Sequence, residues 1–316
     1  MDQGNVAVIV ATYNGRQYLP AALASVATQS QPPAELIVVD AGSTDGTTDL
    51  LTSITSDFPA VRVIAAPQRC TAPQARNLAL SATDATYIAT LDQDDLMAPD
   101  RLSQQLAVLT AEPAFTAVGG RLRRIDANGA PIPRAHNSRR FQQGWPTNRE
   151  RIRWTLPTFS PTVTSALMYR RAALVAAGGF DEAHPLTDDY ALTARLASED
   201  ALTILDCDVG SYRWHNDMTS LRHHRRQLFE TRMLQWRLIH ERLRTQPDLG
   251  TIDAMIRPAQ GWSARQLRTA LDLLHALFAE ATTRPNLDAE DHTWIEGDFA
   301  RGCEQIETAL LSSIRR

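Results

Sequence analysis

Short apolar runs alternate with segments of helical spacing through the first hundred residues, and this alternation constrains the fold more than any other feature of the sequence. The runs are rich in β-branched residues, and each ends in polar residues typical of a turn. Strands that follow one another in parallel need a crossover connection, usually a helix, and such units are right-handed. The sequence therefore predicts an α/β fold with a largely parallel sheet. The predicted strands lie at residues 6–12, 35–40, 61–65 and 87–91.

Polar side chains follow three of these strands at the point where each strand ends. Asn14 comes after the first strand, Asp40 closes the second, and a group of acids at residues 92–95 closes the fourth. In open α/β sheets, ligands bind outside the edge where the carboxyl ends of the strands meet. We therefore expect a nucleotide site where these side chains converge.

The acidic group at residues 92–95 reads Asp-Gln-Asp-Asp and places three carboxylates within four residues. Such carboxylates repel one another unless a cation lies among them. Hard oxygen ligands that leave room for water and phosphate oxygens are the usual site of Mg²⁺ or Mn²⁺. The stretch therefore predicts a divalent metal site that grips a diphosphate, although an Asp-rich turn is the plainer interpretation of this motif alone.

A second acidic pair, Asp188 and Asp189, begins a segment of helical spacing, with Thr187 as the expected N-cap. The helix dipole stabilises carboxylates in the first turn, and this role alone would explain the pair. The functional interpretation is that one of the two is a general base on a rigid helix end. These residues alone leave both interpretations open.

His215 follows a strand-like run and stands two residues after Arg213. A single histidine is more often structural than a ligand. Its position just after a strand, close to an arginine, makes it a candidate for contact with a metal or a phosphate.

The pattern is less regular between the first and second acidic groups. Residues 115–125 predict a strand, and residues 131–161 mix Pro, Arg, His and Trp with little period. We expect the latter to be a loop that borders the acceptor side. Residues 165–177 return to an ordered pattern, which predicts a helix that ends at Gly178 and Gly179.

Several stretches in series resemble the motifs of the inverting glycosyltransferases of family 2, in that family's order and at its usual separations. The resemblance covers about residues 5–216, and it implies the GT-A fold. This is a Rossmann-like fold of nucleotide-diphospho-sugar transferases with a mixed, mostly parallel sheet. The stretches read VIVATYN, VVDAGSTDGT, APQARNLAL, LDQDD, GGFDE, TDDYALTARL and YRWH.

The resemblance also implies which residues bind the donor nucleotide. By this likeness Asp40 and Arg76 contact the nucleotide base, and Thr12 and Tyr13 line its pocket. Asn14, at the end of the same strand, belongs to this group.

The remaining motifs imply the metal site and the catalytic base. By the resemblance Asp92 contacts the ribose or the metal, Asp94 ligates the metal, and His215 helps to hold the metal or the diphosphate. Asp189 is the implied base. The family commonly carries Glu-Asp at this position, whereas this chain has Asp188-Asp189, and the shorter first acid leaves the supporting role of Asp188 open.

The implied reaction moves a sugar from a nucleoside-diphosphate donor to a hydroxyl of a glycan, a lipid-linked sugar or another acceptor. Mn²⁺ or Mg²⁺ would neutralise the leaving diphosphate while a carboxylate removes the acceptor proton. Base and leaving group on opposite faces of the sugar give single displacement with inversion. UDP-sugars are the expected donors by analogy only.

Two other functions compete with this one. A catalytically silent sugar-nucleotide or glycan binder would share the fold, but the intact LDQDD and TDDY stretches argue against it. A sugar-phosphate nucleotidyltransferase would open with a Gly-rich, basic phosphate loop, and the first strand is followed by none.

Charge and cysteine content limit the possible partners of the protein and its cellular compartment. The net charge of −4 gives no indication of nucleic-acid binding. The three cysteines are scattered, which favours free thiols in a reducing cytosol. No signal-peptide pattern and no apolar run of the roughly 18 to 20 residues that span a membrane is present. We expect a cytoplasmic protein whose membrane contact, if any, is peripheral and at the inner face.

Residues 217–316 lie outside the resemblance and predict an α-helical extension to a catalytic domain at residues 1–216. The first helix, residues 221–244, has an apolar stripe and seven arginines against two glutamates. Further helices are predicted at residues 264–282 and 287–311, the last with a surplus of acids. The basic helix could pack on the catalytic domain or form a homodimer contact, which we favour, or lie on an anionic membrane surface or beside a lipid-linked acceptor.

Overall fold

The chain divides into two compact units, and one of them is discontinuous in sequence. The sheet unit comprises Met1–Arg134 and Thr162–Arg222, and the helical unit comprises Ala135–Pro161 and His223–Arg316. The predicted domains, 1–216 and 217–316, differ from these units chiefly in Ala135–Pro161, which belongs to the helical unit.

The computed structural model describes most of the chain. Residues 134–143 of the predicted loop lie outside the described residues. The described residues are 5–54, 61–133, 144–199, 201–259, 261–285 and 287–314.

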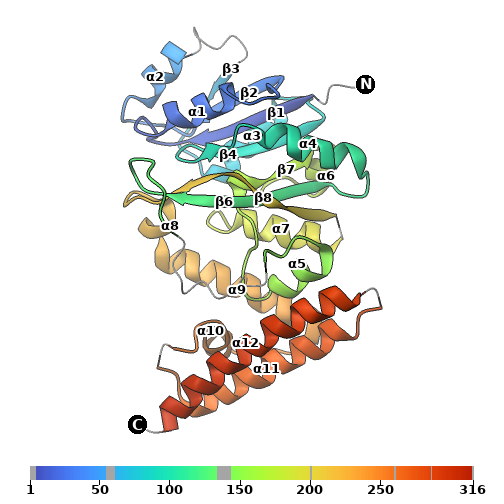
Figure 1. Ribbon diagram of the computed structural model, residues 1–316. Coiled ribbons are helices and arrows are strands. Elements are labelled where there is room, and N and C mark those ends of the chain that lie inside the picture. Colours follow the sequence, from blue (N-terminus) through green and yellow to red (C-terminus); the bar gives the residue numbers. More distant parts are fainter. Residues whose placement is uncertain are drawn as a thin grey trace. The chain divides into compact units, whose positions relative to one another are not determined.

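The first half of the sheet is parallel, as predicted. Its strands are β1 (Val6–Thr12), β2 (Glu35–Asp40), β3 (Val61–Ala65) and β4 (Tyr87–Asp92), in the order β3-β2-β1-β4 (Figure 1). The pairing places Thr12 opposite Asp40 and Ala11 opposite Asp92. The carboxyl ends of β1, β2 and β4 therefore lie side by side at one edge.

The second half of the sheet is mixed. β7 (Met168–Arg170) pairs antiparallel with both β4 and β6 (Ala117–Ile125), β8 (Leu202–Arg213) is parallel to β6, and β5 (Leu96–Met97) is antiparallel to β8. Among the described residues, the full order is β3-β2-β1-β4-β7-β6-β8-β5. The mixed, mostly parallel sheet expected from the sequence is confirmed.

The helix predicted at residues 165–177 is wrong in its first half. These residues include β7, and only the later part forms a helix, α6 (Arg171–Ala176). A short apolar run does not distinguish strand from helix, and here the pairing of Met168 with Ala89 and Val118 decides in favour of a strand.

Both faces of the parallel half are buried. Val6, Val8 and Val10 of β1 share a core with α1 (Leu19–Ala27) and α4 (Arg101–Ala111). Ala7 and Ile9 point the opposite way and are also buried, and α3 (Ala72–Ser81) contacts β1 and β2. This burial explains why the strands read as continuous apolar runs. The other helices of this unit are α2 (Thr47–Ile54), α7 (Asp188–Ser198), α8 (Thr219–Arg222) and the 3₁₀ helix η2 (Thr164–Ala166).

A fully buried arginine, Arg101, joins α4 to the sheet. Its guanidinium donates to the carbonyl oxygens of Ser165 (2.6 Å), Thr90 (2.9 Å) and Leu167 (2.9 Å) and to Oε1 of Gln105 (3.0 Å). Burial lowers its pKa to about 9. These bonds connect β4, η2 and α4 at the start of the acidic stretch.

The helical unit has its own hydrophobic core, built around Ile239, Ile252, Leu267 and Ile295. The predicted helix at residues 264–282 matches α11. A further helix, α5, lies within the predicted loop; its N-cap Asn148 accepts a hydrogen bond from the Arg151 N–H at 3.1 Å. The helices are α5 (Arg149–Thr155), α9 (His224–Leu243), α10 (Leu249–Ile256), α11 (Ala264–Thr282) and α12 (Ala289–Ile314).

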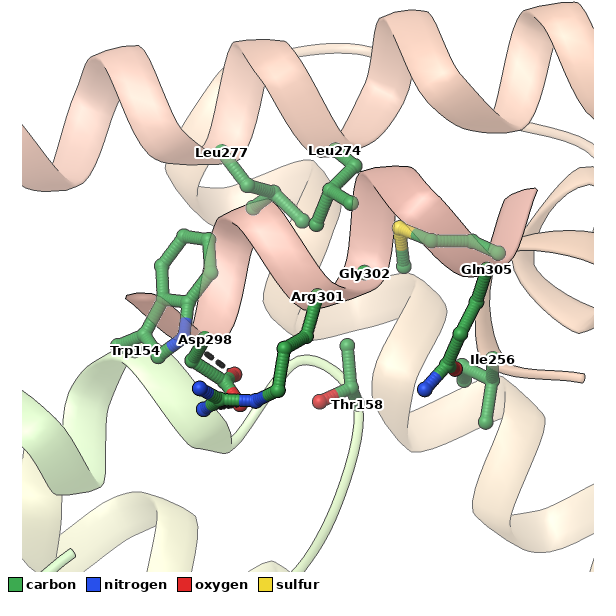
Figure 2. Close-up of a pocket in the computed structure, with 10 residues that line it drawn as sticks. Trp154, Thr158, Ile256, Leu274, Leu277, Asp298, Arg301, Gly302 and Gln305 are labelled. Atoms are coloured by element: carbon green, nitrogen blue, oxygen red, sulfur yellow. Dashed lines mark hydrogen bonds and ion pairs between the residues drawn. The ribbon is translucent and has the colours of Figure 1, made fainter. Parts of the chain in front are cut away.

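A cavity of about 230 Å³ lies within the helical unit (Figure 2). Leu274 and Leu277 of α11 line one side, and the Asp298 carboxylate lies at another. Asp298 accepts from the Trp154 indole N–H at 2.9 Å and from Arg301 at 3.1 Å. These bonds tie α5 to α12 at the cavity wall.

Across the described residues, none of the helices combines the length and the apolar character that crossing a bilayer requires.

We expect Arg101→Met to lower the free energy of unfolding by about 3 to 5 kcal/mol, because it leaves several buried acceptors without a donor. Urea denaturation followed by circular dichroism measures the change. The matched control is Arg62→Met, an exposed arginine that donates to the Ala82 carbonyl oxygen, with an expected loss of roughly 0.5 kcal/mol. Equal losses in the two variants would contradict the structural role of Arg101.

Candidate active site

The residues predicted to bind the nucleotide lie at the carboxyl ends of β1 and β2. Asp40 accepts hydrogen bonds from the Ser43 N–H (2.9 Å) and from the Thr48 hydroxyl (2.7 Å). Burial alone would raise the pKa of Asp40, but these hydrogen bonds outweigh it and the pKa is lowered. Asp40 is therefore a fixed, charged acceptor that suits the N–H groups of a nucleotide base.

The loop after β1 has a fixed conformation. Asn14 adopts a left-handed backbone with φ of 51°, and its Oδ1 accepts from the Thr44 N–H at 2.8 Å. Its own N–H donates to Ser43 Oγ at 2.9 Å. Asn14 thus joins the loop after β1 to the loop after β2, and asparagine tolerates this backbone conformation better than most residues.

Gln93, the uncharged residue of the acidic stretch, connects that stretch to the end of β1. Its Oε1 accepts from the Thr12 hydroxyl (2.6 Å) and from the Tyr13 N–H (2.9 Å), and its Nε2 donates to the Tyr13 carbonyl oxygen (3.2 Å). A Cβ at Gly15 would collide with this same Gln93 amide. We did not identify Gln93 from the sequence, because an uncharged residue between acids gives no chemical signal.

Arg76 joins the two acidic groups that the sequence separates. Nη2 donates to Oδ1 of Asp92 and Nη1 to Oδ2 of Asp188, each at 2.7 Å. Arg76 is only 6% exposed. Burial alone would lower its pKa, but Asp188 and Asp92 raise it, so the guanidinium stays charged. Its predicted contact with the nucleotide base stays a prediction, since both of its terminal nitrogens bind carboxylates in the structure.

The neighbouring Asn77 attaches the GGFDE stretch to the same helix. Its amide donates to the Phe180 carbonyl oxygen (2.9 Å) and to Oε1 of Glu182 (2.7 Å), and its Oδ1 accepts from the Phe180 N–H (2.9 Å). A Cβ at Gly179, whose φ is 73°, would lie 2.6 Å from that Oδ1. Helix α3 therefore holds both the GGFDE stretch and, through Arg76, the first residue of α7.

Asp188 and Asp189 occupy the first turn of α7. Burial raises the pKa of Asp188 to about 7, although Arg76 favours its charged form. Burial also raises the pKa of Asp189, whose Oδ1 accepts from the Tyr190 N–H (2.7 Å) and whose Oδ2 faces the Thr164 N–H (3.4 Å). A raised pKa makes a carboxylate a stronger proton acceptor once it is ionised, which suits proton abstraction.

Asp94 and His215 meet at the other end of the acidic stretch. His215 Nε2 lies 2.8 Å from Asp94 Oδ2, and the His215 ring packs against Tyr18 with 4.6 Å between ring centroids. The structure thus brings two of the three predicted metal residues into contact, whereas the third, Asp92, binds Arg76.

The third carboxylate of the acidic stretch, Asp95, is buried. It accepts from the Arg213 N–H at 2.9 Å, and burial together with the charges of Asp94 and Asp92 raises its pKa well above its usual range. Asp95 therefore connects the acidic stretch to β8 rather than facing a ligand.

The donor set fits a metal that shares its ligands with a substrate. The described part of the chain contains no group of three or more His, Cys, Asp or Glu side chains that could hold a metal ion by itself. Mg²⁺ is usually bound through one or two carboxylates, with substrate phosphates completing the shell. Asp94, with His215 beside it, matches that description.

The chain is similar to known proteins in both sequence and fold. Residues 7–176 match the family model described as glycosyl transferase family 2. The sequence is 37% identical over 128 residues to TuaG of Bacillus subtilis, which is named as a glycosyltransferase of teichuronic acid biosynthesis. That match covers 40% of this chain and 50% of TuaG, so the chain spans about half the length of this relative.

Solved structures resemble the whole chain. A structure of S. aureus TarS with UDP-GlcNAc superposes with a TM-score of 0.60 at 18% identity, covering 98% of this chain and 92% of that one. A mannosyltransferase of Pyrobaculum calidifontis with GDP-Man and Mn²⁺ gives a TM-score of 0.56 at 20% identity, covering 97% and 87%. At such identities the likeness shows the fold, and the predicted GT-A fold is confirmed.

The raised pKa of Asp188 predicts a pH dependence of stability. The folded carboxyl keeps its proton up to about pH 7, whereas the unfolded one loses it near 3.8. Its contribution to the free energy of unfolding is therefore full below pH 3.8 and is lost as the pH rises to 7. Between these two pKa values the free energy of unfolding falls by about 1.4 kcal/mol for each pH unit.

Because asparagine does not titrate, Asp188→Asn should fall less in stability than the wild type between pH 4 and 7. Urea denaturation at a series of pH values measures the difference. The control is Asp84→Asn, whose side chain is fully exposed and whose curve should run parallel to that of the wild type. A parallel curve for Asp188→Asn as well would show that this carboxyl does not hold its proton in the folded protein.

Proposed function

The chain belongs to glycosyl transferase family 2, and from this premise we propose that it transfers a sugar from a nucleoside-diphosphate donor to a hydroxyl group of an acceptor, with inversion. The observation that carries the proposal is the Arg76 guanidinium, which binds Asp92 of the acidic stretch and Asp188 beside the candidate base. Carboxylates from distant parts of the chain therefore surround one site, as a displacement between donor and acceptor requires.

The donor nucleotide is proposed to bind at the ends of β1 and β2. Asp40 accepts the N–H groups of the base, and the loop of Thr12, Tyr13 and Asn14, held by Gln93, forms the wall of the pocket. The TarS structures hold UDP and UDP-GlcNAc, whereas the mannosyltransferase holds GDP-Man. We propose a UDP-sugar as the donor of this chain.

Asp94 and His215 are proposed to hold a divalent cation, Mn²⁺ or Mg²⁺, together with the donor diphosphate. When bound, the cation neutralises the charge that develops on the leaving nucleoside diphosphate. Its protein ligands are few, so the donor supplies the remaining oxygens. Support comes from the short contact between Asp94 and His215 and from the Mn²⁺ in the mannosyltransferase complex.

Asp189 is the proposed general base. Its carboxylate removes the proton of the acceptor hydroxyl as the oxygen attacks the anomeric carbon, a contribution of about 10²- to 10⁴-fold in such reactions. Asp188, bound to Arg76, fixes the first turn of α7 and so orients the base. Attack from the face opposite the diphosphate inverts the anomeric centre. The acceptor is proposed to be a glycan or a lipid-linked sugar, in keeping with the biosynthetic name of TuaG.

The direct test is release of nucleoside diphosphate from a panel of UDP- and GDP-sugars in the presence of Mn²⁺. We expect release from at least one UDP-sugar and none after the cation is removed with a chelator. A protein that binds these donors, as shown by a raised melting temperature, but never releases a diphosphate with any acceptor offered would be a silent binder.

We expect Asp189→Asn to bind the donor as the wild type does and to lower turnover by about 10²- to 10⁴-fold, because only the proton acceptor is lost. Calorimetric titration of donor beside a turnover assay separates the two effects. Asp84→Asn, an exposed aspartate, is the matched control and should change neither quantity. Unimpaired turnover in Asp189→Asn would remove the assignment of the base.

His215→Gln should raise the Mn²⁺ concentration for half-maximal turnover by roughly 10- to 100-fold, since glutamine keeps the size of the side chain but is a poor ligand. Asp94→Asn should have an effect at least as large and should also weaken metal-dependent donor binding. Titrating Mn²⁺ at saturating donor measures both. His292→Gln, on α12, is the control, and an equal shift in that variant would argue against a metal role for His215.

A further inference from the structure

Helix α9 has apolar side chains on two faces, and only one of them is buried. Ile239 belongs to the core of the helical unit and is fully buried, with an exposure of 0%. Phe229 and Met233 lie one turn apart on another face and are 59% and 39% exposed. A large exposed aromatic side chain beside an exposed methionine is a feature that soluble surfaces usually avoid.

Arginines surround these exposed side chains. Arg225, Arg226 and Arg237 are exposed and lie three to eight residues from Phe229, at spacings that place them on the same side of the helix. Arg226 pairs at 2.8 Å with Glu230, whose side chain is buried, whereas Arg237 approaches the exposed Glu241 at 4.0 Å, and an exposed i,i+4 pair of this kind is weak. Over residues 221–244, seven arginines stand against two glutamates. The face is therefore apolar at its centre and cationic around it.

Trp236, seven residues after Phe229, packs in part against the core of the helical unit. Its ring stacks on His240 with 5.1 Å between centroids and 9° between planes, and both side chains are half-buried. Phenylalanine and methionine with arginines on one helix face suit the interface of a membrane, where the apolar side chains enter the acyl boundary and the guanidinium groups reach phosphates.

The charge pattern favours a membrane over a second copy of the chain. In a two-fold dimer through this face, each patch would meet its own copy, so the surrounding arginines would lie opposite arginines. An anionic bilayer instead offers phosphates to every arginine and acyl chains to Phe229 and Met233.

We propose that the exposed face of α9, formed by Arg225, Arg226, Phe229, Met233 and Arg237, binds the surface of an anionic lipid bilayer. The sequence favoured packing or dimerisation for this helix, and the exposure of Phe229 and Met233 is the observation that reverses the preference. This proposal is independent of the proposed function, since it concerns a surface of the helical unit. Membrane binding here would bring the chain to membrane-bound partners without a spanning segment.

The test is co-sedimentation of the full chain with vesicles of phosphatidylcholine alone or mixed with an equal part of phosphatidylglycerol. We expect binding to the mixed vesicles only, weakening as salt is raised. Phe229→Ser with Met233→Ser should weaken binding by roughly tenfold or more. Arg225→Gln with Arg237→Gln should weaken it by roughly 25-fold, since each arginine near the surface contributes about fivefold.

The control is Leu311→Ser with Ile314→Ser, two apolar residues that are each 59% exposed and lie on α12, a helix with six acidic residues and one arginine. This variant should bind the mixed vesicles as the wild type does, and circular dichroism should show every variant folded. Failure of the folded wild type to bind mixed vesicles would overturn the proposal. So would equal binding to phosphatidylcholine alone, or a dimer, detected by light scattering, that is lost in the Phe229 and Met233 variant.

Discussion

The candidate site depends on one buried cation. Arg76 lies on α3 and holds two carboxylates, Asp92 at the end of β4 and Asp188 at the start of α7, which is 112 residues further along the chain than Arg76. A buried guanidinium without partners would be strongly destabilising, so the fold must bring both acids to it. The same requirement that keeps Arg76 paired therefore assembles the acidic stretch and the candidate base around a common point.

The electrostatic environments of the acids differ according to their partners. Asp40 accepts hydrogen bonds from neighbouring backbone and hydroxyl groups, and these lower its pKa. At Asp95 and Asp188 the effect of burial outweighs the hydrogen bonds and charges that favour the carboxylate, so their pKa values rise. The acids of the candidate site therefore include one whose charged form is favoured, Asp40, and two whose protonated forms are favoured by burial, Asp95 and Asp188. Division of roles among acids by environment is a common way for one site to perform both binding and proton transfer.

The sequence predicted the parallel half of the sheet because β1, β2 and β4 are buried on both faces and their apolar runs are unambiguous. It also predicted the helix at residues 264–282, whose apolar period is regular. It did not predict β7, because three residues such as Met168–Arg170 acquire strand geometry only from their neighbours. It gave the residue types of the candidate site but not their connections. The bonds of Gln93 to the end of β1, and of Arg76 to both acids, are tertiary contacts between distant segments and leave no local pattern.

The pairing of β6 with β8 has a consequence for biosynthesis. Ala117 pairs with Leu202, 85 residues later, and the segment Ala135–Pro161 of the other unit must be made in between. At a translation rate of about 5 to 20 residues per second, β6 leaves the ribosome roughly 4 to 17 seconds before its parallel neighbour exists. The nascent chain therefore presents an unpaired strand edge during that interval, and such an edge is a template for pairing with other chains.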